Sequence, residues 1–182
     1  MKVLAKILMV AILALTFTSS AASAEIIAPT TLEDGNLILI ASYEKDKVFY
    51  YANRKSVTVQ KSEKPFYQVS MDGVQIKFSD EYYQKHGNYI NAPYTISENL
   101  NFRFQYRIEG KFRDIFVDRN GNWNICWDVP SSYRHSAGSP MVTNAAEVAF
   151  VSAFNKKFIG DEIDRYTGKP VIDKSLYDAL GI

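Results

Sequence analysis

The amino-acid sequence predicts an α+β fold, in which an amphipathic helix packs on a twisted antiparallel sheet that is open or barrel-like. Residues 101–109, "NFRFQYRIE", alternate strictly between apolar and polar side chains, and this period of two is the strongest signal for a strand. Residues 139–158 instead repeat alanine and phenylalanine about every four positions, which is the period of a helix. A run of strands followed by a helix indicates a single α+β domain.

The first 24 residues have the organisation of a secretory signal peptide. Lys2 and Lys6 precede a short apolar stretch, "ILMVAILALTF", and the small residues "ASA" follow at 22–24. The apolar stretch is shorter than the roughly 20 residues that span a bilayer, which favours cleavage over an uncleaved anchor. We therefore expect cleavage after Ala24, a single mature domain over residues 25–182, and an exported protein in the periplasm, at the cell surface or secreted.

Composition excludes several classes of function. The chain has 21 lysine plus arginine and 20 aspartate plus glutamate residues, and the two leader lysines leave 19 against 20, a formal net charge of −1. This balance lacks the basic patch that nucleic-acid binding usually needs. We expect no cofactor and no metal, because no glycine-rich phosphate loop follows a strand and the histidines and cysteine lack zinc-ligand spacing. No second apolar stretch is long enough to span a membrane.

The first half of the mature chain contains five short segments with strand character. In the fourth segment the odd-numbered residues from Tyr67 to Met71 share a face, and in the fifth the even-numbered residues from Val74 to Phe78 do so. The five segments are residues 37–42, 47–53, 56–60, 65–71 and 74–78.

The second half predicts three strands. In residues 101–109, one face is apolar (Phe102, Phe104, Tyr106 and Ile108) and the other carries polar residues, including Arg103 and Arg107. Two further strands, 112–117 and 122–129, are joined by "DRNGN", whose Asn-Gly pair suits a tight turn with positive φ.

The last predicted strand places the single cysteine. Trp123, Ile125, Trp127 and Val129 continue the apolar face, so regular alternation puts Cys126 on the opposite, polar face. A β-bulge would break this inference. We expect the C-terminal elements to cover the thiol rather than leave it open, because an exposed free thiol is a liability outside the cytoplasm.

Residues 139–158 predict the amphipathic helix. Ser139 is placed as the N-cap and Pro140 as the first helical residue, and the apolar stripe is Ala146, Phe150, Phe154 and Phe158. We expect Phe150 and Phe154 to anchor this helix on the sheet, Lys156 and Lys157 to occupy its last turn, and Gly160 to end it. The tail "DKSLYDALG" predicts a second short helix.

The stretch "FYYANRKSVTV" has an aromatic pair, a polar step, and then serine before a β-branched residue. Its positions Tyr50, Tyr51, Asn53, Ser56 and Val57 resemble the surface-adhesin protein E-like families of small secreted bacterial proteins. The resemblance implies an antiparallel sheet with helical support, at the cell surface or in the periplasm, with adhesion to host molecules in some members. It carries over no catalytic residue. The residue types favour a structural corner, because asparagine prefers turns and serine hydroxyls bond nearby backbone.

Catalytic and metal-binding patterns are weak. His135 lies among Ser132, Ser136 and Ser139, with Asp128 upstream, but no Gly-x-Ser-x-Gly elbow marks a nucleophile, so a serine-rich connection is favoured. The stretch "DRNGNWN" begins like a calcium loop. Its sixth position is tryptophan where glycine is required and its twelfth is valine where glutamate is required, which favours a hairpin turn.

Two surfaces are candidates for binding. Residues 79–100 form a long predicted connection, and such connections are often functional. Its tyrosines either contact a partner or cap one end of the sheet; they are Tyr82, Tyr83, Tyr89 and Tyr94. Tyr50 and Tyr51 of the aromatic pair are further candidate contacts. The second surface is the polar face with Arg103, Arg107, Asn122 and Asn124, for which the alternative is a solvated face of ion pairs.

These observations predict a secreted or envelope-associated module that binds or adheres without catalysis. Its partner would be a protein or a glycan at the cell surface. The alternative is a hydrolase or an enzyme-inhibitor domain of the cell envelope, for which His135 is the residue to test.

Overall fold

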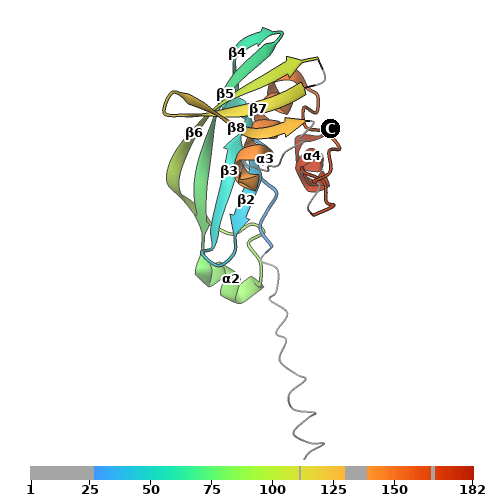
Figure 1. Cartoon of the computed structure of the whole chain (residues 1–182). Coiled ribbons are helices and arrows are strands. Elements are labelled where there is room, and N and C mark those ends of the chain that lie inside the picture. The colour runs from blue at the N-terminus through green and yellow to red at the C-terminus, as the bar shows by residue number, and fades with distance from the viewer. Residues whose placement is uncertain (1–26, 111, 130–138, 165–166) are drawn as a thin grey trace, which may run out of the picture.

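The computed structural model describes residues 27–110, 112–129, 139–164 and 167–182 (Figure 1). The predicted signal peptide, its cleavage point and His135 lie outside these residues. Within the described ranges, no helix has both the length and the apolar character needed to cross a membrane.

The fold is dominated by one antiparallel sheet that remains open, so the barrel-like form is not found. Its order is β1-β2-β3-β5-β6-β7-β8, and β4 pairs with β5 beside the end of β3. The strands are β1 Thr31–Leu32, β2 Leu37–Tyr43, β3 Val48–Asn53, β4 Thr58–Glu63, β5 Phe66–Phe78, β6 Tyr94–Glu109, β7 Phe112–Arg119 and β8 Asn122–Val129.

Among the described residues, four helical segments accompany the sheet. They are the 3₁₀ turn η1 Arg54–Ser56 and the helices α2 Asp80–His86, α3 Pro140–Phe154 and α4 Lys174–Leu180. Figure 1 shows α2 at one end of the sheet, whereas α3 and α4 lie beside it. We call the face toward α3 the inner face of the sheet and the opposite one the outer face.

The long helix α3 begins where the sequence predicts, with Pro140 directly after Ser139. It ends earlier than predicted, because Asn155 adopts the left-handed conformation with a φ of 52° and its N–H bonds back to Val151. Gly160 and the lysine pair at 156–157 therefore lie beyond the helix. α4 follows the prediction, with Asp173 as its N-cap and Gly181 as its left-handed C-cap.

β5 runs unbroken through residues that the sequence analysis assigned to two strands. Odd-numbered Val69 and Met71 face inward, and even-numbered Ile76 and Phe78 face outward, so the buried face changes within one strand. The change occurs at Gly73, where an added Cβ would lie 2.9 Å from the Tyr51 carbonyl oxygen. Glycine is therefore required by the close approach of two strands, and it does not mark a turn.

The inner core lies between the sheet and the two C-terminal helices. Phe150 is fully buried against Tyr106 and Phe158, whereas Phe154 is only partly buried. Glu147 is also fully buried here, and its carboxylate accepts hydrogen bonds from the N–H groups of residues 158 and 159, each at 2.9 Å, and from the Tyr177 hydroxyl at 2.8 Å. Three donors compensate the burial of this acid.

A second, smaller core lies on the outer face at the α2 end of the sheet. Its aromatic members meet edge-to-face or stacked, with ring centroids 5.1 to 6.5 Å apart. They are Phe49, Tyr51, Phe78 and Tyr89, together with Leu37, Ile76 and Ala92. The N-terminal segment 27–32 covers this core, and Ala28 and Leu32 pack against it.

The β7–β8 turn is the predicted hairpin. Asn120 and Gly121 have φ angles of 56° and 84°, and the Asp118 carboxylate accepts a hydrogen bond from the Gly121 N–H at 2.7 Å. Both positive φ values match a two-residue turn between antiparallel strands.

The predicted faces of β8 are wrong, because a bulge interrupts its alternation. Ile115 pairs with Trp127 and Phe116 pairs with Ile125, so Cys126 is the extra residue. Cys126 and Trp127 are both buried, whereas Ile125 is 45% exposed on the outer face. The expected burial of the thiol is confirmed, and burial raises the pKa of Cys126 to about 12.

Candidate functional site

The predicted tyrosine contacts other than Tyr50 belong to the outer core and do not lie on an open loop. Residues 79–100 are not a long connection, since they contain α2 and the start of β6. Tyr51 and Tyr89 are fully buried and offer no surface to a partner. Tyr82, Tyr83 and Tyr94 are half-buried and pack against the same cluster. These rings thus cap one end of the sheet.

The hydroxyls of the two buried tyrosines differ. The Tyr51 hydroxyl donates to the Pro29 carbonyl at 2.7 Å, which ties the N-terminal segment to β3, and burial raises the pKa of Tyr51. The Tyr89 hydroxyl is buried without a hydrogen-bond partner among the described residues. Tyr50 points to the other side of β3, where it meets Tyr43 edge-to-face at 5.6 Å.

The polar step after the aromatic pair is a structural corner, as its residue types favour. The Asn53 side chain accepts from the Lys55 N–H at 3.1 Å. The Ser56 hydroxyl donates to the Asn53 carbonyl at 2.7 Å and accepts from the Asp72 N–H at 2.8 Å, which fastens η1 to β5. These bonds occupy the polar groups of the corner.

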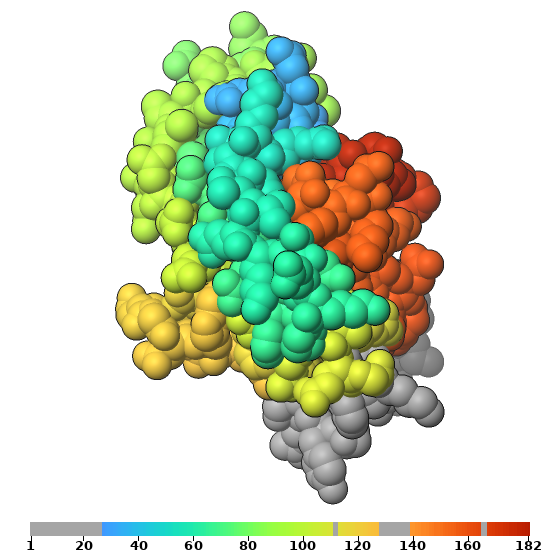
Figure 2. All heavy atoms as spheres, turned by 90° about the horizontal axis from the view of Figure 1, so that it is seen from above, coloured from blue at the N-terminus to red at the C-terminus, as the bar shows by residue number. Residues whose placement is uncertain are grey.

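The open half of the outer face, on β6, β7 and β8, carries the other two predicted residues. Strand register aligns Gln105 with Phe116 and Phe116 with Ile125, and it aligns Asp118 with Trp123. The resulting outer patch consists of Arg103, Arg107, Phe116, Trp123 and Ile125. Figures 1 and 2 show that the tip of the β7–β8 hairpin (gold in Figure 2) projects from the body of the molecule.

Both arginines of the outer patch are held by shielded carboxylates. Arg103 donates to Asp118 at 2.9 Å, and Arg107 donates through Nε to Asp114 at 2.8 Å and also through Nη2. The Asp118 and Asp114 side chains are only 11% and 9% exposed. The two pairs leave the patch formally neutral while fixing where the guanidinium groups lie.

Each arginine also contacts a ring of the patch. The guanidinium carbon of Arg103 lies 5.4 Å from the Trp123 ring centroid, and that of Arg107 lies 5.4 Å from the Phe116 ring centroid. Beside them, Gln68 donates to Gln105 at 2.7 Å. The patch therefore combines aromatic, aliphatic and guanidinium groups, and each guanidinium is held by a carboxylate and a ring.

This arrangement is suited to docking a partner. Aromatic residues and arginine are enriched in the parts of protein interfaces that carry most of the binding energy.

No group of three or more His, Cys, Asp or Glu residues that could hold a metal ion occurs in the part of the chain that the structure describes.

Sequence reasoning missed three residues of the patch, namely Phe116, Trp123 and Ile125. The last two were assigned to the core because alternation was extended across β8. The signal that could have located them is the pair Cys126-Trp127, two consecutive apolar residues that break the alternation where the bulge lies.

Comparisons with models of protein families, with curated proteins and with solved structures found no match to this chain.

Proposed function

We propose that this chain is an exported, envelope-associated or secreted module that binds a protein partner through the outer patch and has no catalytic activity. The observation that carries the proposal is the juxtaposition of Phe116, Trp123 and exposed Ile125 with two arginines fixed by shielded carboxylates. Such side chains lose little conformational entropy on binding because they are already held in place.

Charge and shape favour a protein over other partners. The two arginines and two aspartates cancel, so the patch lacks the electrostatic attraction that a nucleic acid or another polyanion needs. Trp123 and Phe116 each have an arginine over the ring, which leaves less of the ring faces open for stacking on a sugar. A protein surface can contact the ring edges, the exposed isoleucine and the remaining guanidinium donors together.

Two features of the sequence support export and adhesion. Residues 1–24 have the organisation of a signal peptide, and the segment from Tyr50 to Val57 resembles the surface-adhesin protein E-like families. Export is tested by the intact mass of the exported protein, which should begin at Glu25. Retention of Met1 in the exported form would contradict the proposed cleavage.

The binding role is tested with two matched substitutions on the outer face. Ile125 lies in the patch and Ile96 lies at the far end of the same face, and they are 45% and 50% exposed. A partner captured from envelope fractions or host-matrix proteins is purified and its saturable affinity for the mature chain is measured. We expect Ile125→Asp to weaken this affinity by about thirtyfold or more, as for an interface hot spot, and Ile96→Asp to change it by less than twofold.

Equal affinity of the wild type and Ile125→Asp would contradict the proposed patch. Saturable binding of a purified glycan that Ile125→Asp abolishes would contradict the choice of a protein partner. Turnover of envelope polysaccharide or peptide that His135→Ala abolishes would contradict the absence of catalysis.

A further inference from the structure

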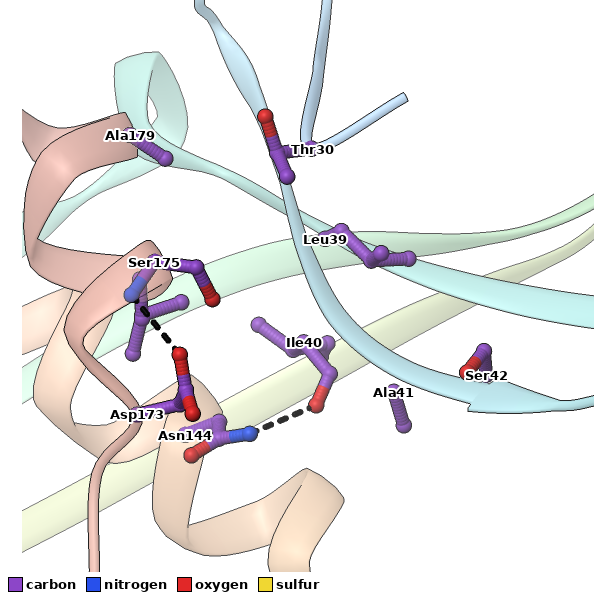
Figure 3. A pocket seen from close by; sticks show the side chains of 10 residues that line it. Thr30, Leu39, Ile40, Ala41, Ser42, Asn144, Asp173, Ser175 and Ala179 are labelled. Carbon is purple, nitrogen blue, oxygen red and sulfur yellow. Dashed lines mark hydrogen bonds between the residues drawn. The ribbon is translucent and has the colours of Figure 1, made fainter. Parts of the chain in front are cut away.

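A small cleft lies between β2 and the two C-terminal helices, away from the outer patch (Figure 3). Its volume is about 180 Å³, below the roughly 300–1,000 Å³ of pockets that enclose small-molecule ligands. Its lining comes from β2, the residue before β1, α3 and α4, and includes Ile40, Ser42, Asn144, Asp173, Ser175 and Leu176. The size suits one side chain or a short stretch of backbone.

The cleft lies where the neighbouring strand β1 stops. β1 pairs with β2 only at Leu37 and Ile38. The last hydrogen bond between the N-terminal segment and β2 joins the Leu39 N–H to the Thr30 carbonyl at 2.9 Å. The chain then leaves the row at Pro29, whose carbonyl accepts from the Tyr51 hydroxyl on the outer face. Proline cannot donate a hydrogen bond, so it ends a row of strand pairing.

The edge of β2 beyond Leu39 therefore has no neighbouring strand among the described elements. Ala41, Ser42 and Tyr43 continue β2 past the end of β1 and pair only with β3. A free strand edge is a ready template for pairing with another extended segment.

One backbone acceptor at this edge is satisfied by a side chain. The Asn144 amide on α3 donates to the Ile40 carbonyl at 2.9 Å, as Figure 3 shows, and Ile40 is the bulged residue of β2. The amide occupies the position of a donor that an added strand would supply. The Asn144 amide therefore satisfies the Ile40 carbonyl when no further strand pairs with this edge of β2.

One charged side chain occurs among the described residues that line the cleft. This charge belongs to Asp173, an exposed residue whose carboxylate accepts from the Ser175 N–H at 2.8 Å. Hydrogen bonds from Ser175 lower the pKa of Asp173, so the carboxylate stays ionised. Lysine and arginine do not occur among the lining residues, so a cationic group is the complementary charge.

We propose that this cleft accepts an extended peptide segment that pairs with the β2 edge in line with β1 and places a lysine or arginine side chain against Asp173. Main-chain hydrogen bonds to β2 supply the attachment, and the carboxylate selects the basic residue. The inference goes beyond the proposed function, because the cleft shares no residue with the outer patch.

The test uses the mature chain and two capped hexapeptides, Thr-Val-Lys-Val-Thr-Val and its copy with glutamate in place of lysine. We expect the lysine peptide to bind about tenfold more tightly than the glutamate peptide, since an attraction replaces a repulsion at Asp173. In amide-resolved NMR spectra, the signals of Ala41, Ser42 and Tyr43 should shift on titration. A lysine peptide whose backbone nitrogens are methylated should not bind.

Three variants test whether the preference for the lysine peptide depends on the cleft, and not on the overall charge of the chain or on loss of folding. Asp173→Asn should reduce the preference for the lysine peptide to about twofold or less. Asp178→Asn is the matched control and should leave the preference unchanged. Asp178 is exposed on α4, the helix that Asp173 caps, where it pairs with Lys174 and does not line the cleft. Asn144→Ala frees the Ile40 carbonyl and should tighten binding of the lysine peptide severalfold.

Thermal unfolding verifies that each variant is folded. The proposal is overturned if the lysine peptide at millimolar concentration leaves the Ala41 to Tyr43 signals unchanged. It is also overturned if both peptides bind equally, or if the shifted signals belong to the outer patch.

Discussion

The inner and outer cores lie on opposite faces of one sheet and are closed in different ways. The inner core is covered by α3, a helix of 15 residues, and by α4. The outer core is covered by the N-terminal segment and the seven-residue α2, which reach only one end of the sheet. The difference shows why the same face is a sealed core at the α2 end and an open patch over β6 to β8.

The largest expected effect is the loss of a ring from the inner core. Phe150 is fully buried between the sheet and the C-terminal segment, so Phe150→Ala should lower the free energy of unfolding by about 3–5 kcal/mol. Phe154→Ala is the control on the same helix and should cost less, because Phe154 is only partly buried. Equal losses in chemical denaturation would show that the two rings contribute alike to the inner core.

A smaller effect is expected where β5 changes its buried face. In Gly73→Ala the new methyl group would lie 2.9 Å from the Tyr51 carbonyl oxygen and from a Phe102 ring carbon, so the strands must separate slightly. We expect a loss of about 1–3 kcal/mol in the free energy of unfolding. Gly110→Ala is no matched control, because its φ of 60° adds strain of its own. An unchanged denaturation midpoint for Gly73→Ala would contradict the close approach of β3 and β5.

The buried acid predicts a pH dependence for the inner core. Burial raises the pKa of Glu147, so the folded chain holds this proton more tightly than the unfolded chain. The stability contribution is present below the unfolded pKa of about 4.3 and is lost as the pH rises through the folded pKa, by at most about 1.4 kcal/mol per pH unit. Denaturation from pH 4 upward gives the slope of the free energy of unfolding against pH for the wild type and for Glu147→Gln. The difference between the two slopes is the contribution of Glu147. A wild-type stability that rises over that range relative to the variant would reverse the predicted sign.

The smallest effect distinguishes the two tyrosines of the outer core. Tyr51→Phe removes the hydrogen bond to Pro29 and should cost about 0.5–1.5 kcal/mol. Tyr89→Phe removes a buried hydroxyl that has no partner in the described chain, and it should leave stability unchanged or raise it. If Tyr89→Phe proved the more destabilising of the two, the Tyr89 hydroxyl would have a partner that this arrangement does not contain.

The inner core could be predicted from the sequence because regular elements build it. The period of two at Phe102 and Phe104 and the helical repeat at Ala146 and Phe150 each identify one buried face. The Asn-Gly turn and the start of α3 at Pro140 were also predictable, since they depend on residues adjacent in the chain, whereas the end of α3 at Asn155 was not.

The outer core and the patch could not be predicted in the same way. Both depend on interruptions of period, namely the change of face at Gly73 and the bulge at Cys126. The sequence shows the interruption at Gly73 only as a gap between two alternating runs, which also fits two strands. Whether tyrosines such as Tyr89 cover a core or contact a partner depends on the path of segment 27–32, and no local pattern specifies that path.

β5, β6 and β7 each pair with the strand that follows in the chain, whereas residues 27–29 bond to Tyr51 and Tyr89 far along it. Contacts between neighbours in sequence close short loops and form early, while distant contacts must wait for both partners. Residues 27–29 should therefore dock last among the described residues. Until β3 and the turn after α2 are in place, residues 27–29 lack the Tyr51 hydroxyl and the Tyr89 N–H to which they bond, so this end of the outer core should be the last part of the described fold to close.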